Sequence, residues 1–434
     1  MISEIKQRIT QLNNGEIPSG YEKTEFGIFP CDWVKNETFG NLFDFYGGLG
    51  KSRDELGDEG HAYLHYGDLH RGAFNVVSHE QYKQLPKYDV VLKGTETYLM
   101  EDGDVAFLDA SEDLEGTSRA VLIDNPDNDP FIAGLHIIYG KSKDESLEKW
   151  YKQYITTSES VRKQFQRLAA GFKVYGVNRD TLPRIQVAYP KSTEEQSRIA
   201  EILMKWDEAI ELQKQYITKI ILRNGAVVDK LLSSKDNWKP LPLSTFVELK
   251  NGYAFKSETY INEGKYKIIT IKNVKSGEFD LTECCTIDEL PNNLQTHQLL
   301  SMGDIIISLT GNVGRACIVN AKNCLLNQRV GKIVVKTISP VFIYEILQTN
   351  RFVSKMQNIA QGCAQANLSN SDVEDFVAFF PYDGDGLDIR TIDKISCILS
   401  EFRNELALQK ELLNKLLLQR KALQQYLLNG IVRV

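Results

Sequence analysis

Residues 194–232 read EEQSRIAEILMKWDEAIELQKQYITKIILRNGAVVDKLL, and the apolar side chains in this stretch recur every seven residues. They form two interleaved rows, with polar residues at only two positions: Leu203, Ile210, Ile217, Asn224, Leu231 and Ile199, Trp206, Gln213, Ile220, Val227. Spacings that alternate between three and four residues are typical of a coiled-coil seam, in which one face of a helix packs against a partner helix. The stretch therefore predicts a helix about 58 Å long that needs a partner.

The same pattern returns 196 residues later, so the stretch is an internal repeat. Apolar residues of the first stretch correspond to apolar residues of the second, Gln213 corresponds to Gln409, and Asn224 corresponds to the polar residue Arg420. We expect the two helices to pair with each other as an antiparallel coiled coil and to act as a spacer. Gln213 and Gln409, near the helix midpoints, are predicted to lie within about one layer of each other and to fix the register. The predicted spacer residues are Ile199, Leu203, Trp206, Ile210, Gln213, Ile217 and Ile220, with Ile395, Leu399, Phe402, Leu406, Gln409, Leu413 and Leu416.

A β-rich globule is predicted before each long helix. Residues 104–108 and 119–123 read as strands, and apolar spacing predicts helix over 144–168 with a break near 156–158. The region from Trp238 to Pro381 repeats this plan, since Trp33 answers to Trp238, 68–74 to 273–279, 103–104 to 303–304, and 171–190 to 362–381. The predicted class is α+β with pseudo-two-fold symmetry. Because Leu12-Asn13-Asn14-Gly15 resembles Leu427-Leu428-Asn429-Gly430, we also expect the two chain ends to close the arrangement cyclically.

These patterns divide the chain into five parts. They are a helical segment at 1–16, a globular domain at 17–190, a long helix at 191–235, a second globular domain at 236–387 and a second long helix at 388–434. A chain of 434 residues is too long for one hydrophobic core, which agrees with this division.

Composition suits a cytoplasmic protein, and the charge pattern is compatible with DNA binding although the net charge taken alone argues against it. No stretch reads as a signal peptide, membrane span or lipidation motif, and the seven cysteines form no C-x-x-C pair, so reduced thiols are expected. The net charge is −7, but residues 250–275 carry six lysines against two glutamates. An acidic total with a basic patch suits a DNA-binding protein that also contacts other proteins.

Motifs for chemistry are incomplete. Residues 45–52 approach a phosphate-binding loop, but Phe45 stands where G-x-x-x-x-G-K-[ST] requires glycine, so we expect a surface turn that carries Lys51 or Lys256 toward a polyanion. Residues 128–131 (NDPF) lack the second proline of the motif with which adenine methyltransferases hold a flipped base. Neither H-E-x-x-H nor G-x-S-x-G occurs. The sequence therefore predicts no catalytic residue and no metal site.

Polar side chains in loops that align between the halves are the candidates for DNA contacts. The turn Gly311-Asn312-Val313-Gly314-Arg315 can present backbone N–H groups and a guanidinium to phosphate or guanine, although a plain hairpin turn fits it equally well. The amides of 327–328 and 365 can pair with adenine edges. The candidate set is Lys51, His70, Arg71, Ser118, Arg119, His136, Lys173, Tyr175, Lys256, Asn273, Lys275, Asn312, Arg315, Asn327, Gln328, Arg329 and Gln365.

Several phrases together resemble the specificity subunit of type I restriction-modification enzymes, and the resemblance covers essentially the whole chain. They are residues 18–30 (PSGYEKTEFGIFP), Trp33, Ala133-Gly134-Leu135-His136, Asn327-Gln328-Arg329 and Glu195-Gln196-x-x-Ile199-Ala200.

The resemblance implies that 17–190 and 236–387 are target-recognition domains. Each would read one half of a split, asymmetric site in double-stranded DNA, and the helix pair would set the gap. Two methyltransferase subunits would dock on the helices, and restriction/translocase subunits would join them. S-adenosylmethionine, ATP and Mg²⁺ would be bound by these partners, and this chain would carry no chemistry.

Two other functions remain open from the residues alone. One is a coiled-coil scaffold whose globules bind protein or carbohydrate, and salt-dependent DNA binding that needs both globules would separate it from a DNA reader. The other is a stand-alone methyltransferase, against which the missing base-holding motif argues.

Overall fold

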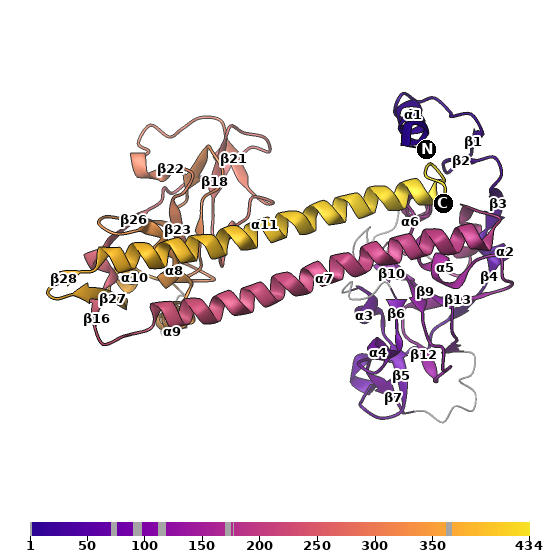
Figure 1. The fold of residues 1–434 in the computed structure, drawn as a ribbon, viewed down its shortest axis with the longest axis horizontal. Helices are drawn as coiled ribbons and strands as arrows, with labels where there is room; N and C mark the ends of the chain where they lie inside the picture. Colours follow the sequence, from indigo (N-terminus) through magenta and orange to yellow (C-terminus); the bar gives the residue numbers. More distant parts are fainter. Residues whose placement is uncertain are drawn as a thin grey trace. The chain divides into compact units, whose positions relative to one another are not determined.

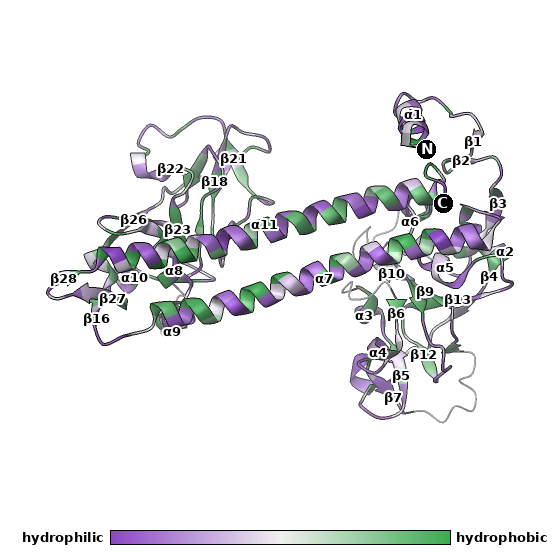
Figure 2. Ribbon diagram, in the orientation of Figure 1, coloured by the Kyte–Doolittle hydropathy of each residue, from purple (hydrophilic) through white to green (hydrophobic). Residues whose placement is uncertain are grey.

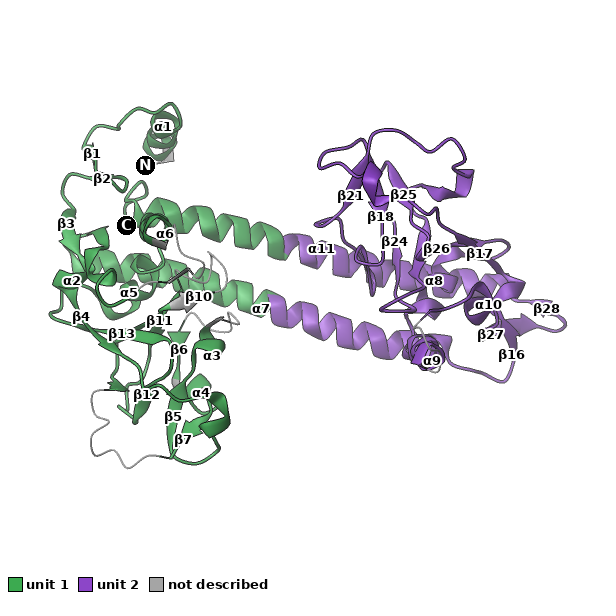
Figure 3. Cartoon of the chain, turned by 180° about the vertical axis from the view of Figure 1, so that it is seen from behind, with its two compact units in different colours: residues 1–213, 413–434 green, residues 214–412 purple. Residues whose placement is uncertain are grey.

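The computed structural model describes residues 2–70, 76–89, 98–111, 119–169, 175–176, 178–361 and 367–434. The chain forms two compact units (Figure 3). Unit 1 comprises Met1–Gln213 and Leu413–Val434, and unit 2 comprises Lys214–Leu412. None of the described helices is both long enough and apolar enough to span a membrane.

Unit 1 contains two main sheets. The first has the order β4-β13-β9-β11-β6, with β4 (Phe43–Gly47), β13 (Ile137–Ser142), β9 (Val105–Leu108), β11 (Ala120–Ile123) and β6 (Val76–Val77). The second has the order β7-β5-β12-β8, with β7 (Lys87–Tyr88), β5 (His61–Leu64), β12 (Phe131–Ala133) and β8 (Leu99–Met100). In the second sheet β5 and β12 run parallel, whereas their outer neighbours are antiparallel to them.

The first sheet of unit 1 is buried on both faces. Val105 and Phe107 point into a core shared with α5 (Lys149–Ile155), α6 (Glu159–Ala169) and the start of α7 (Thr193–Leu232), whereas Ala106 and Leu108 point into a second core with β5 and β12. Successive side chains of a strand face opposite sides, so a strand covered on both faces must be apolar throughout. This explains the uninterrupted apolar strands in Figure 2 and confirms the strands and the broken helix predicted for unit 1.

Unit 2 repeats both sheets, apart from the edge strand β6, which has no counterpart among the described strands of unit 2. The first sheet has the order β17-β26-β23-β24, with β17 (Val247–Asn251), β26 (Val330–Val335), β23 (Ile305–Ser308) and β24 (Ala316–Ile318). The second has the order β21-β18-β25-β22, with β21 (Cys285–Ile287), β18 (Tyr266–Ile269), β25 (Cys324–Leu326) and β22 (Leu299–Leu300). Here too the inner pair, β18 and β25, is parallel and the outer strands are antiparallel. The two units therefore share one fold.

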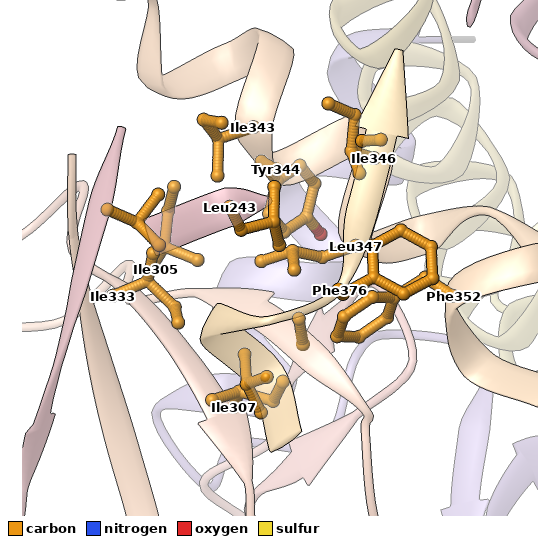
Figure 4. Close-up of a cluster of buried hydrophobic side chains, with 14 of the residues drawn as sticks. Leu243, Ile305, Ile307, Ile333, Ile343, Tyr344, Ile346, Leu347, Phe352 and Phe376 are labelled. Carbon is orange, nitrogen blue, oxygen red and sulfur yellow. The ribbon is translucent and has the colours of Figure 1, made fainter. Parts of the chain in front are cut away.

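The helical core of unit 2 lies against its first sheet. Ile305, Ile307 and Ile333 of this sheet meet side chains of α8 (Pro340–Gln348) and α9 (Asn350–Gln361), as Figure 4 shows. A further ribbon closes each unit near its long helix. It pairs β3 (Val34–Thr38) with β15 (Gln186–Tyr189) in unit 1, and β16 (Trp238–Pro242) with β27 (Val377–Asp383) in unit 2.

Within unit 1, the first half of α7 packs against the last turns of α11 (Ile389–Leu428). Asp207 accepts two hydrogen bonds from Arg420, at 2.8 and 3.0 Å, and Glu195 accepts from Arg433 at 2.6 Å. The residue number falls along the C-terminal segment as it rises along α7, so the pairing is antiparallel. Tyr154 of α5 also donates to Asp207, at 2.9 Å, and thereby joins the helix pair to the globule.

Within unit 2, the second half of α7 packs against the first half of α11. Arg223 forms an ion pair with Glu405, and Val228 and Leu231 contact the core that holds Ile395 and Leu399. Every predicted seam residue of both helices is buried or half-buried. Gln213 and Gln409 belong to different units, so their proximity stays a prediction.

The two chain ends meet in unit 1 (Figure 1). Tyr21 donates to the carbonyl of Gly430 at 2.6 Å, and Arg8 donates to that of Ile431 at 3.0 Å. The resemblance between the ends is also structural. Both α1 (Ile2–Asn13) and α11 are followed by a glycine with positive φ, and the residue after that glycine donates its N–H to a carbonyl five positions back, in the Schellman pattern. The cyclic closure is therefore confirmed within this unit.

The compact units cut each long helix in two, whereas the division made from the sequence separates helices from globules. The two divisions differ because each half-helix packs against the globule at its own end.

Candidate nucleic-acid interface

A short turn links the second sheet to the first at the same place in each unit. In unit 1 it comprises residues 134–136, between β12 and β13, and in unit 2 it comprises residues 327–329, between β25 and β26. Because the strand pairs are equivalent, His136 of unit 1 occupies the position of Arg329 in unit 2. We call these two segments the reading turns.

The backbone of each reading turn packs closely against a glycine of another loop. A Cβ atom added to Gly48 would lie 1.9 Å from the carbonyl oxygen of Gly134, and one added to Gly252 would lie 2.1 Å from that of Asn327. The residue after each glycine donates its N–H to the last residue of β12 or β25, at 2.7 and 2.8 Å respectively. The glycines of 47–50 thus include one required for close backbone approach.

The structure shifts the alignment of these loops by one residue. If the two Lys-Ser dipeptides are aligned in sequence, Gly48 corresponds to Tyr253. In the structure, however, Gly48 and Gly252 make the equivalent close contacts with the reading turns. Phe255 therefore takes the place of Lys51, which corrects the equivalence of Lys51 and Lys256 expected from the sequence.

In unit 2 the reading turn borders an open groove of about 700 Å³. The groove has an aromatic and aliphatic part, a basic rim and one acidic side chain, and its lining residues are Phe255, Tyr260, Ile261, Asn262, Thr270, Ile271, Lys272, Glu283, Cys284, Cys285, Asn327, Gln328 and Arg329. Gln328 and Arg329 are exposed at its edge. Arg329 forms no side-chain hydrogen bond or ion pair with any residue of the described ranges, so its guanidinium is free to bind a ligand.

Backbone contacts fix the unit 2 turn. Asn327 is 8% exposed, and its side-chain oxygen accepts from the Arg329 N–H at 3.3 Å. Gln328 donates its N–H to Tyr253 at 2.9 Å, and Leu309 donates to the Arg329 carbonyl at 3.0 Å. Asn327 therefore braces the turn, while the next two side chains face solvent.

The unit 1 turn presents an imidazole instead. His136 is exposed, has a φ of 61°, and lies with its Nδ1 2.9 Å from Oδ1 of Asp109. The ring of Tyr66 meets it edge-on at 5.4 Å. Burial raises the pKa of Asp109, while the nearby His136 lowers it. The contact with Asp109 leaves Nε2 as the ring nitrogen that can face a ligand.

A second histidine lies behind this turn. Burial is the main cause that lowers the pKa of His65, Asp68 opposes it, and Arg53 and His136 add to it. His65 Nδ1 accepts the N–H of Gly67 at 3.1 Å, so the neutral ring supports the backbone after β5. Arg53 pairs with Asp68 at 3.1 Å beside it.

The structure corrects the prediction that Asn273 contacts DNA. Its side chain is 1% exposed, its oxygen accepts two hydrogen bonds from Thr270, and its amide group donates to the carbonyls of Asp280 and Glu283. The side chain of Asn273 joins two parts of its own loop by hydrogen bonds, so it is not available to contact a base. Lys275 forms an ion pair with Asp280, which holds the pKa of that carboxyl well below its usual range.

The remaining candidates lie in several places. Lys51 forms an ion pair with Glu55 at 2.8 Å and lies 5.2 Å from the ring centre of Tyr88. The hydrogen bond from Lys51 is the main cause that lowers the pKa of Glu55 to about 2. Arg119 donates to the carbonyl of Leu69 at 2.9 Å and so supports the fold.

In unit 2, Arg315 holds the position of Arg119, because β24 and β11 pair equivalently with β23 and β9. It is half-buried, while Asn312 in the same turn and Lys256 are exposed. A Cβ on Gly311 would lie 3.2 Å from Ile271, which places this turn beside the groove.

Six candidates are not tested by side-chain geometry. Arg71, Ser118, Lys173 and Gln365 lie outside the described residues. His70 ends α3 (Tyr66–His70) and Tyr175 lies in β14 (Tyr175–Gly176), where the backbone alone is described.

Sequence reasoning missed Tyr66 and Asp109 in unit 1, and Phe255 and Tyr260 in unit 2. No motif marks them, because they come from segments that are separated from the turns in sequence. Lys272 could have been found, since it lies in the basic stretch 250–275. Within the described ranges, no three His, Cys, Asp or Glu side chains gather into a metal-binding set.

Comparison with known proteins agrees with this architecture. The S subunit of a type I restriction-modification system from M. genitalium aligns over 91% of this chain and 96% of its own length, with a TM-score of 0.53 and 17% identity. A chain from a structural study of complex assembly and conformational transition in the type I R-M system aligns over 96% and 100%, with a TM-score of 0.57 and 12% identity. At these identities the likeness shows a shared fold.

A family model described as the type I restriction modification DNA specificity domain matches residues 70–221 and 235–418, once over each globule and its long helix. Because the two matches together cover most of the sequence, this chain belongs to the family of type I restriction-modification DNA specificity domains.

Proposed function

We propose that this chain is the DNA specificity subunit of a type I restriction-modification complex and that each unit reads one half of a split, asymmetric site. The observation that supports this most is the pair of reading turns. Apart from the edge strand β6 of unit 1, the two units repeat the same strand order, yet they present His136 in one and Gln328-Arg329 in the other. A repeated scaffold with unlike reading residues recognises two unlike half-sites.

Linking two such modules makes the second binding event intramolecular, so two modest sites give one strong interaction. The chain's net charge of −7 makes binding by either unit alone weak, because phosphate neutralisation dominates affinity for DNA. Both the tether and partner subunits are therefore needed for binding.

Exposed apolar side chains that recur at equivalent positions of the two long helices support docking of two identical partners. Leu212, Tyr216, Ile221 and Leu222 of α7 are exposed, and so are the residues 196 positions later, Leu408, Leu412, Leu417 and Leu418. Leu222 is 70% exposed and Leu418 is 69% exposed. Large exposed apolar side chains at equivalent positions of the two helices are candidates for contacts with a partner. We assign them to the docking of two methyltransferase subunits, which would bind S-adenosylmethionine.

Restriction/translocase subunits, which use ATP and Mg²⁺, would join that complex in the cytoplasm. The role of this chain is recognition and assembly, and the transfer of the methyl group to adenine takes place on its partners.

Co-expression with a tagged methyltransferase subunit from the same genome tests both parts. We expect a complex with two methyltransferase subunits that methylates adenine at one bipartite motif, read by sequencing the modified host DNA. Leu222→Glu should reduce the stoichiometry to one methyltransferase, and the double variant with Leu418→Glu should abolish co-purification, because a buried unpaired carboxylate is costly. Met302→Glu, which alters an exposed side chain outside the helices, is the control. Undiminished binding of two methyltransferases by the double variant would refute the docking surface.

A further inference from the structure

We propose that Arg329 selects a guanine in the half-site read by unit 2, and that the reading turns are the elements that distinguish the two half-sites. The proposal rests on the function proposed above and adds a residue and a base to it.

The first reason is the freedom of the Arg329 side chain combined with the rigidity of its backbone. Its N–H and carbonyl are both hydrogen-bonded, and the glycine contact at Gly252 holds the preceding residue in place. The side chain is exposed and has no partner within the described residues. A fixed backbone and a planar guanidinium reduce the conformational freedom that this arginine loses when it binds. Its planar fork matches the O6 and N7 acceptors of guanine in the major groove.

The second reason is the composition of the groove beside it. Phe255, Tyr260 and Ile271 supply an apolar surface, and Lys272 adds a charge on another wall. Lys272 lies 3.5 Å from Glu283, and both side chains are at least 75% exposed, so this pair is easily exchanged for a phosphate. Lysine is a point charge suited to phosphate, whereas the arginine fork is suited to a base edge. The groove thus offers one positioning group and one reading group.

The third reason is the contrast with unit 1. His136 holds the same position, but Asp109 occupies its Nδ1 and leaves one nitrogen for a ligand. A single nitrogen cannot form the two parallel hydrogen bonds of an arginine with guanine. The same scaffold position therefore gives a two-bond contact in unit 2 and a one-bond contact in unit 1, which makes the two half-sites unequal.

The test compares methylation motifs of the full chain expressed with its methyltransferase subunit in a methylation-free host. Arg329→Ala should relax the motif at one guanine of one half-site. Discrimination at that position should fall about tenfold to a hundredfold, while the other half-site is unchanged. Arg329→Lys should recover part of the discrimination. Lys272→Ala should lower methylation of all sites alike, because a phosphate contact carries no sequence information.

The two proposals fail in different ways. If the wild-type complex methylates no bipartite motif, the proposed function itself fails. If the wild-type motif is bipartite but Arg329→Ala leaves it unchanged, or relaxes both half-sites, the assignment of Arg329 is overturned. The thermal unfolding of Arg329→Ala should match that of the wild type, since the side chain is exposed and forms no hydrogen bond or ion pair with the described residues. A loss of stability would show a structural role instead.

Discussion

Gly252→Ala is expected to lower the free energy of unfolding of unit 2 by about 3 kcal/mol, the upper range for adding a methyl group where the chain is closely packed. The added methyl group would lie 2.1 Å from the carbonyl oxygen of Asn327 and 2.6 Å from that of Leu326. Both contacts are with backbone atoms, which cannot rotate away as a side chain can. Relief therefore requires the reading turn itself to move, and we expect sequence discrimination in that half-site to fall together with stability.

Gly225→Ala is the matched control in the same unit. Gly225 lies within α7, and nothing lies within 4 Å of a Cβ added there. Alanine is the better helix former, so this variant should gain up to about 1 kcal/mol. Urea unfolding of both variants, followed by circular dichroism, measures the difference. Equal stability of Gly252→Ala and wild type would show that the close approach of the two loops is not required.

Asp207→Arg is expected to destabilise unit 1 by about 2 kcal/mol, between the values for exposed and buried ion pairs. The aspartate accepts two hydrogen bonds from Arg420 and one from Tyr154, and the pair is only about a fifth to a quarter exposed. Burial raises the pKa of Tyr154, so the phenol remains a donor. The variant would place two guanidinium groups together and leave that donor without its acceptor.

The double reversal, Asp207→Arg with Arg420→Asp, should recover a large part of the loss, because it restores opposite charges. Glu194→Arg breaks an exposed pair with Arg198 one turn away on the same helix and should have almost no effect. Thermal unfolding of the wild type, both single variants (Asp207→Arg and Arg420→Asp) and the double reversal measures the coupling, with Glu194→Arg as the control. If the double reversal is as unstable as the single variant, the ion pair does not determine how these helices pair.

The same position carries opposite charges in the two copies of the repeat. Arg403 stands 196 residues after Asp207, and it pairs with Glu345 of α8 within unit 2. The repeat thus keeps a link between the helix pair and the globule in each unit but reverses the charge. An α11 helix paired with a second α11 in the same register would bring Arg403 opposite Arg420, so the charges favour pairing of α7 with α11.

The long helices and the doubled fold could be predicted because both depend on periodic patterns. A coiled-coil seam repeats every seven residues, and its rows at Ile199 and Leu203 are buried as the spacing requires. Strands buried on both faces, such as Val105–Leu108, are apolar without interruption. The match between Trp33 and Trp238 places each tryptophan in the core of its own unit.

The groove could not be predicted, because four separate loops supply its walls. Phe255, Lys272, Glu283 and Arg329 are neighbours only after β18 and β25 have paired in parallel. Asn273 shows the opposite error. An asparagine in an aligned loop is a candidate for a base contact in sequence. In the structure, however, its side-chain amide already donates hydrogen bonds to backbone carbonyls of its own loop. Residue type identifies hydrogen-bonding capacity, and only the structure shows whether that capacity is already used.

The most direct test changes the gap between the two halves of the recognised sequence. The wild-type complex should methylate its own site, and changes in the identity of bases within the gap should have little effect. Inserting one or two base pairs should reduce methylation at least about tenfold, because two units on a common spacer cannot then engage both halves at once. Methylation that is indifferent to gap length, or that needs only one half-site, would contradict recognition by two linked units.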